Sequence, residues 1–332
     1  MSGNLLGTLN YHLQVSLLGN GFLKWERARS ALKLRRPGSW KHPHLSPPLS
    51  CSPWLKELLS RHYLRGRYAN GHQPVAWVTS GAPVEHLQAL GYFLVYPENH
   101  AAVCGIRRPA EAMCVAPAEA GYSRDICSYP RTDFGSLLSG QTPVGRLPKP
   151  DLLVCCNNIC QTVVVWYQAL AEYFHCPLDL IDTPFLYDEA QPHVVAYVAR
   201  QIEESFALAE RVAGRKIDQR RFRQVIERAR EASLLWAKVM ATSKHRPAPL
   251  LAFDEFIHMA PIVEMRGEAC AVDYYTSLLR ELDGRVARGV GALRHEKKRL
   301  LWDNLPIWPK MRRLGDTLAA RGVALVASTY TN

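Results

Sequence analysis

The sequence lacks the short motifs by which many enzymes bind nucleotides or activate a serine. Neither Gly-x-x-x-x-Gly-Lys-Ser/Thr nor Gly-x-Gly-x-x-Gly occurs in its 332 residues, so the chain should not itself bind ATP or a dinucleotide in the usual ways. The Gly-x-Ser-x-Gly turn of α/β-hydrolases is absent too. These absences exclude the most familiar nucleotide-binding and serine-hydrolase classes.

Signals for export and membrane insertion are also missing. No apolar run approaches the roughly 18–20 residues that span a bilayer, and residues 1–23 contain no Lys or Arg to begin a secretory signal. We therefore predict a cytoplasmic protein with no membrane partner, in which the cysteines stay reduced. The odd count of nine cysteines also argues against a disulfide framework.

The positive charge is concentrated at one end of the chain. Residues 1–70 hold eleven Lys/Arg and two Asp/Glu, which accounts for most of the net charge of +11 and argues against a nucleic-acid partner for the rest. A basic N-terminal segment of this kind can bind an acidic surface or an anionic ligand, or it can be a solvated leader. Turn-forming residues at 43–53 favour the second interpretation. We predict that residues 1–70 form a basic, partly disordered leader and linker.

Residues 71–190 alternate strands with helices. Apolar strands are expected at 74–79, 93–96, 151–156 and 178–182, with helices at 84–90 and 162–174. This alternation predicts an α/β domain with a doubly wound parallel sheet, in which ligands bind at the carboxyl ends of the strands. Two such ends, 96–98 and 155–158, would converge if their strands are neighbours.

The remaining sequence predicts a helical insertion and a second sheet. Residues 191–296 carry apolar positions at helical spacing, with Gly214 as a stop and Asp218 as an N-cap. A strand–helix–strand pattern follows at 297–332. One such unit cannot build a covered sheet alone. We therefore predict the start of a second, incomplete α/β domain that continues in a longer parent sequence.

Cysteine is the residue type whose distribution points most directly to chemistry, because six of the nine lie between positions 104 and 160. Thiolates bind soft metal centres such as zinc and iron–sulfur clusters. No Cys-x-x-Cys pair occurs, however, and buried unreactive cysteine is common. Spacing alone leaves both interpretations open. His100 and Glu98 are weak candidates for an acid or base beside these thiols.

Four longer strings resemble a known family. They are 75–85 (VAWVTSGAPVE), 95–100 (VYPENH), 121–129 (GYSRDICSY) and 300–308 (LLWDNLPIW). They are similar to the 2-hydroxyacyl-CoA dehydratase/benzoyl-CoA reductase family, and most of all to the B-type subunits of its ATP-dependent benzoyl-CoA reductases. The resemblance covers residues 75–332 and not residues 1–50.

The resemblance implies a [4Fe–4S] cluster held by three cysteines of each subunit. Cys104 and Cys127 match two of the family's ligand positions. The third ligand usually comes from the second α/β domain, and Cys156 is the substitute that this chain offers at a strand end. The other cysteines of the region and beyond are expected to be structural: Cys114, Cys155, Cys160, Cys176 and Cys270.

The resemblance also implies an activity and partners. It predicts a subunit of a benzoyl-CoA reductase, which reduces the aromatic ring of its acyl-CoA substrate to a cyclic dienoyl-CoA. A related cluster-binding subunit and a separate ATP-hydrolysing electron activator would be its partners, and the subunit would not be active alone. A 2-hydroxyacyl-CoA dehydratase subunit, which eliminates water, and a cluster-free scaffold are the alternatives.

Overall fold

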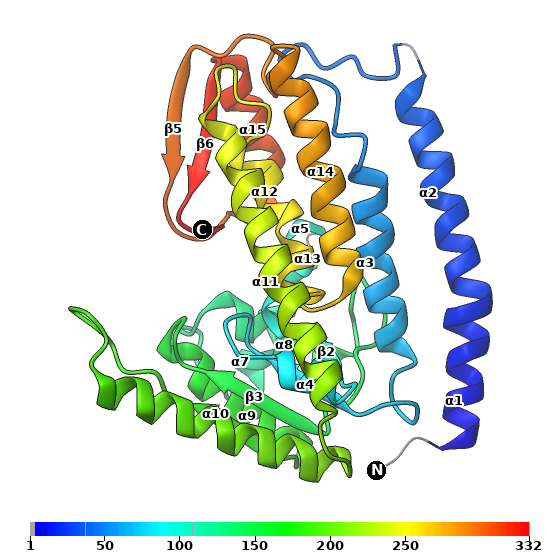
Figure 1. The fold of residues 1–332 in the computed structure, drawn as a ribbon, viewed down its shortest axis with the longest axis vertical. Helices are drawn as coiled ribbons and strands as arrows, with labels where there is room; N and C mark the ends of the chain where they lie inside the picture. Colours follow the sequence, from blue (N-terminus) through cyan, green and yellow to red (C-terminus); the bar gives the residue numbers. More distant parts are fainter. Residues whose placement is uncertain (1–3, 37, 108, 332) are drawn as a thin grey trace. The chain divides into compact units, whose positions relative to one another are not determined.

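The computed structural model describes residues 4–36, 38–107 and 109–331 (Figure 1). The chain divides into two compact units, each built from two separate stretches of sequence. Unit 1 comprises residues 4–18 and His62–Val225, and unit 2 comprises Gly19–Arg61 and 226–331. Among the described residues, no helix is both long and apolar enough to cross a bilayer.

Unit 1 is built around a four-stranded parallel sheet in the order β2-β1-β3-β4. The strands are β1 (Val75–Val78), β2 (Phe93–Val95), β3 (Leu152–Cys156) and β4 (Leu178–Ile181). Every residue of β1, β2 and β3 is buried, which explains why these strands are apolar on both faces. The predicted α/β fold with a parallel sheet is confirmed.

Helices follow the strands of unit 1 and pack against the sheet. Trp77 of β1 lies in one apolar cluster with Phe134 of α8 and with Trp166 and Tyr167 of α9. The helices of this unit are α1 (Leu5–Tyr11), α4 (Glu85–Ala89), α5 (Pro97–Arg107), α6 (Ala110–Met113), α7 (Ala116–Glu119), α8 (Ser128–Ser139), α9 (Gln161–Phe174) and α10 (Pro192–Ala213). Gly214 ends α10 at φ 65°, as its sequence position predicted.

Three helical segments lie at the points where the chain changes unit: η1 (His12–Gly19), α3 (Ser52–Arg67) and α11 (Gln219–Ala241). The short η2 (Thr242–Lys244) follows α11 within unit 2. Asp218 caps α11, because its Oδ1 accepts a hydrogen bond from the backbone N–H of Arg220 at 2.8 Å. This cap confirms the helix start predicted from the sequence.

Unit 2 is mainly helical. It contains α2 (Asn20–Arg35), α12 (Ala252–His258), α13 (Ala260–Glu264), α14 (Ala269–Ala287), η3 (Trp308–Lys310) and α15 (Met311–Ala320), with a two-stranded parallel sheet of β5 (Lys298–Trp302) and β6 (Val323–Ser328). Leu58 and Trp236 pack with Tyr274, Tyr275 and Leu278 of α14 in its core. The Glu281 carboxylate accepts hydrogen bonds from the backbone N–H groups of Ser50, at 2.6 Å, and Cys51, at 3.1 Å, at the start of α3.

Two expectations from the sequence differ from the structure. The ends of β2 and β3 do not meet as neighbours, because β1 lies between them. Within residues 1–70, where we expected a partly disordered leader and linker, the structure has α-helices at Leu5–Tyr11, Asn20–Arg35 and Ser52–Arg67, and a π-helix at His12–Gly19. The predicted domain boundaries at 70, 190 and 296 stay a prediction.

Candidate functional site

The carboxyl edge of the unit 1 sheet carries a row of polar groups joined by hydrogen bonds. Ser80, just after β1, donates its backbone N–H to Glu98 Oε2, just after β2, at 2.6 Å. On the other side of β1, the fully buried Thr79 accepts the backbone N–H of Cys156 at its Oγ1, at 3.0 Å. The loop after β1 therefore links the ends of β2 and β3, which do not touch directly in the sheet.

The row continues from β3 to β4. Asn157 Oδ1 accepts the backbone N–H and the hydroxyl of Thr183, both at 2.7 Å, and its Nδ2 donates to Asp182. Asp182 also accepts the hydroxyl of Tyr197 at 2.9 Å. Gln201 accepts the backbone N–H of Asp182 at 2.8 Å. Helix α10, which supplies Tyr197 and Gln201, thereby fixes the end of β4.

The gap between the ends of β1 and β3 is the point at which the chain order of the sheet reverses, where open α/β sheets bind ligands. Asn158 lies across it and donates its Nδ2 to the carbonyl of Gly81 at 3.2 Å. A Cβ at position 81 would lie 2.7 Å from Asn158 Oδ1. A side chain at position 81 would therefore displace the Asn158 amide from its place against the backbone.

Glu98 is the group in this row best suited to proton transfer. Burial raises the pKa of its carboxyl, and the hydrogen bonds from Ser80 oppose this rise. A carboxyl whose pKa is raised toward neutrality can hold or release a proton during a reaction. The sequence-predicted role of Glu98 as an acid or base stays a prediction, now with a located partner.

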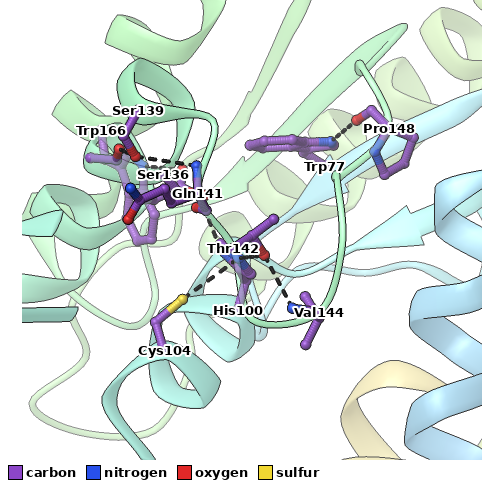
Figure 2. Close-up of polar contacts among 12 residues, drawn as sticks. Trp77, His100, Cys104, Ser136, Ser139, Gln141, Thr142, Val144, Pro148 and Trp166 are labelled. Atoms are coloured by element: carbon purple, nitrogen blue, oxygen red, sulfur yellow. Dashed lines mark hydrogen bonds and ion pairs between the residues drawn. The ribbon is translucent and has the colours of Figure 1, made fainter. Parts of the chain in front are cut away.

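His100 and Cys104 form a second, fully enclosed cluster on α5 (Figure 2). His100 Nε2 lies 2.9 Å from Thr142 Oγ1 and 3.6 Å from Cys104 Sγ. His100 Nδ1 lies 3.6 Å from Asp133 Oδ1 of α8, and neither atom has a hydrogen-bond partner among the described residues. Trp166 donates its Nε1–H to the other oxygen of Asp133 at 3.2 Å.

A loop at 140–148 lies against this cluster and is fastened at several points (Figure 2). Ser136 donates its hydroxyl to the carbonyl of Gln141 at 2.7 Å. Val144 donates its N–H to Thr142 Oγ1 at 3.3 Å, and Trp77 donates its Nε1–H to the carbonyl of Pro148 at 2.9 Å. The fastened loop helps to keep His100 and Cys104 away from solvent, so neither side chain is open to a ligand in this arrangement.

The three thiols predicted as cluster ligands have very different surroundings. Cys104 on α5 is fully buried, and burial followed by the charge of Asp133 raises the pKa of its thiol to about 12. Cys156 at the end of β3 is buried, and burial raises its pKa as well. Cys127 is exposed and precedes the first turn of α8.

The structure brings α5 and α8 into contact, but it does not gather the three thiols. No group of three or more His, Cys, Asp or Glu able to hold a metal ion occurs among residues 4–36, 38–107 and 109–331. A cluster needs deprotonated thiolates in one place. The described thiols therefore do not fit a complete three-cysteine site.

Comparison with known proteins gives the family of this chain. Its relatives are subunits of acyl-CoA dehydratases and reductases. The chain belongs to the family described as 2-hydroxyglutaryl-CoA dehydratase, D-component, whose model matches residues 79–332. The resemblance of the sequence strings to the 2-hydroxyacyl-CoA dehydratase/benzoyl-CoA reductase family is thereby confirmed. A particular likeness to the B-type reductase subunits is not, because that relative is less identical than the dehydratase alpha subunits.

Individual relatives extend the match beyond the family model. The chain is 34% identical over 280 residues to the alpha subunit of (R)-2-hydroxyisocaproyl-CoA dehydratase of Clostridioides difficile, which covers 83% of this chain and 69% of the relative. It is 31% identical over 288 residues to the (R)-phenyllactyl-CoA dehydratase alpha subunit of Clostridium sporogenes, covering 83% and 71%. It is 29% identical over 292 residues to the B-type subunit of benzoyl-CoA reductase of Thauera aromatica, covering 83% and 67%.

Sequence reasoning missed several residues of the site. Thr79, Asn157 and the carboxylate of Asp182 join the strand ends, and each lies directly after a strand. A polar residue at the end of a predicted strand, as at Thr79 and Asp182, or directly after one, as at Asn157, was a usable signal for them. Asp133 gave no such signal, because its partner Trp166 lies 33 residues further along the chain.

Proposed function

We propose that this chain is the alpha-type subunit of a 2-hydroxyacyl-CoA dehydratase, which eliminates water from a 2-hydroxyacyl thioester. The observation that carries the proposal is the similarity to two dehydratase alpha subunits, at 34% and 31% identity over most of this chain. An acyl-CoA substrate and a hetero-oligomeric enzyme belong to the same proposal.

The carboxyl edge of the unit 1 sheet supports this proposal chemically. Elimination of water requires a group that accepts a proton and donors that hold the departing hydroxyl. Glu98 supplies a carboxyl with a raised pKa. Asn158, at the gap between β1 and β3, supplies an amide beside it along the same edge. In the proposal, these side chains bind and orient the polar end of the acyl group.

Benzoyl-CoA reduction is the second candidate function. It is the activity that the sequence resemblance predicted. The strings at 95–100 and 121–129 favour it, and the B-type subunit of a benzoyl-CoA reductase is a relative at 29% identity. The two candidates differ in their substrate class: one acts on a saturated 2-hydroxyacyl group, and the other on an aromatic ring.

A direct competition separates the candidates. The chain would be purified without oxygen, together with its partner subunit, and supplied with an ATP-dependent electron activator. We expect consumption of a 2-hydroxyacyl-CoA, with formation of the enoyl-CoA, and no consumption of benzoyl-CoA. Loss of benzoyl-CoA with formation of a dienoyl-CoA would instead assign the reductase. If neither substrate is consumed by an intact complex, the scaffold alternative stands.

The predicted [4Fe–4S] cluster is tested by iron content. If Cys127 is a ligand, Cys127→Ala should remove one cluster, about four iron and four sulfide, from the anaerobic complex. Cys160→Ala is the matched control, because Cys160 is also exposed and also precedes the first turn of a helix, α9. Equal iron in both variants would exclude Cys127 as a ligand, and an iron-free wild-type complex would exclude the cluster.

A further inference from the structure

Helix α2 has one face held to its own unit and one face turned outward. On the inner face, Arg27 pairs with Glu57 of α3 at 3.0 Å and lies over the ring of Trp54, 5.3 Å from its centroid. Glu26 pairs with Lys56 at 2.8 Å. These contacts fix which side of α2 is covered within unit 2, and therefore which side remains exposed.

The outward face presents a short apolar stripe. Phe22, Trp25 and Leu32 are 60%, 56% and 62% exposed. They lie at helical spacings of three and seven, on one side of the helix. The rings of Phe22 and Trp25 are 5.9 Å apart, and the Arg29 guanidinium lies over Trp25, 5.5 Å from its centroid. Large aromatic side chains left this open usually mark a binding surface.

Cations surround this stripe. Five exposed cationic side chains lie beside it: Arg29 and Lys33 are on the same side of the helix, Lys24 and Arg35 flank that side, and Arg36 follows the last turn. Glu26 is the one acidic residue between positions 20 and 36, and it is engaged by Lys56. The face therefore combines apolar anchors with a positive border, and it would repel a second copy of itself.

The segment that precedes α2 in the chain is apolar without charge. Residues 4–19 contain no Asp, Glu, Lys or Arg. In this segment Leu5, Leu6, Leu9 and Leu13 are 48–79% exposed. Taken by itself, α1 is thus a leucine-rich surface, and α2 is a basic, aromatic one. Neither lies within residues 79–332, which match the family, so these surfaces are not accounted for by the proposed function.

We propose that the outward face of α2 binds the anionic headgroup surface of a phospholipid bilayer. Helices that lie in the membrane interface place Trp, Phe and Leu at the acyl boundary, and their Lys and Arg side chains reach the headgroups. An acidic protein would match the cations, but a bilayer also accommodates the exposed apolar side chains of Phe22, Trp25 and Leu32. Peripheral binding needs no membrane-spanning helix. The proposal differs from the expectation drawn from the sequence that this chain has no membrane partner, and the experiment below decides between them.

Vesicle flotation of the full-length chain tests the proposal. We expect binding to phosphatidylcholine vesicles that contain phosphatidylglycerol, weak binding to pure phosphatidylcholine, and release at high salt. Replacing both Arg29 and Lys33 with Gln should weaken binding about 25-fold, since each cation near an anionic surface contributes roughly fivefold. Phe22→Ser with Trp25→Ser should abolish the binding that survives at moderate salt. All of these side chains are exposed, so the variants should keep the wild-type circular dichroism.

The control is the pair Arg228→Gln and Arg230→Gln on α11, which removes the same charge from exposed positions flanked by Glu227 and Glu231. This control should bind vesicles as the wild type does. Equal loss in the control pair would mean that only net charge matters and would overturn the proposal. Equal binding to pure phosphatidylcholine, or equally tight binding to polyglutamate or duplex DNA, would overturn it too, the latter in favour of an acidic macromolecule.

Discussion

Replacing Gly135 with Ala should destabilise unit 1 by about 3 kcal/mol, although the same change in most helices is stabilising. Gly135 lies in α8, where it meets the end of α6. An added Cβ would lie 2.6 Å from the carbonyl carbon of Met113, and closer still to its oxygen. Since the obstacle is backbone, no rotamer change relieves it, and the two helices must move apart. Chemical denaturation followed by circular dichroism measures the loss.

The matched control is Gly315→Ala in α15, where the added Cβ would meet Phe253 at an ordinary 3.5 Å. This variant should be as stable as the wild type or gain up to about 1 kcal/mol. Adding Met113→Ala to Gly135→Ala should not restore stability, because the clash involves the main chain of Met113. A stable Gly135→Ala protein would contradict the close approach of α6 and α8.

Lowering the pH from about 8 to about 5 should stabilise unit 2 through Glu255, by about 3 kcal/mol. This side chain is 1% exposed. Its carboxylate accepts the hydroxyl of Thr331 at 3.1 Å and that of Ser243 at 3.4 Å. Burial nevertheless raises the pKa of Glu255 from 4.5 to about 7, against the effect of these hydrogen bonds.

The direction of this pH effect on stability follows from proton binding by Glu255. Between pH 4.5 and about 7 the folded protein holds the Glu255 proton and the unfolded chain releases it. The free energy of unfolding therefore rises as the pH falls through 7, and this contribution is complete below 4.5. Glu255→Gln, neutral at every pH, should lose this slope and be more stable than the wild type at pH 8. Glu227→Gln, at an exposed position of α11, is the control. An unchanged slope in Glu255→Gln would show that another group titrates.

Local patterns were enough to predict the elements of the sheet but not their order. The apolar run before Cys156 and the Gly214 stop are properties of a few consecutive residues, and both were predicted correctly. Strand order depends on which hydrophobic faces pack together over long sequence distances, so the position of β1 between β2 and β3 could not be predicted. The helix at 20–35 was missed for a related reason: it is held by Arg27 and Glu26 through residues thirty positions away.

In the candidate site, too, the positions set by local sequence could be predicted, and the contacts between distant segments could not. Glu98 and Cys156 were both placed at the carboxyl ends of predicted strands, where parallel sheets bind ligands, and the structure has them there. Their roles as an acid or base and as a cluster ligand stay predictions. The hydrogen bonds that link the strand ends could not be predicted, because residues such as Thr79 and Cys156 lie 77 positions apart in the chain. The family strings drew attention to Cys104, yet only packing shows that His100 and the loop at 140–148 enclose it.

Unit 2 is built from two separate stretches of sequence, and this affects how the chain folds during synthesis. Glu281 caps the start of α3 by binding Ser50, which lies 231 positions earlier. Closing a loop of that length costs about 5 kcal/mol of chain entropy. During synthesis, Gly19–Arg61 of unit 2 leaves the ribosome before the second stretch of unit 2 has been made. The residues His62–Val225 of unit 1 are added in between, and they can fold in that interval. We expect that folding of unit 1 first would shorten the effective loop and so lower the entropic cost of joining the two stretches of unit 2.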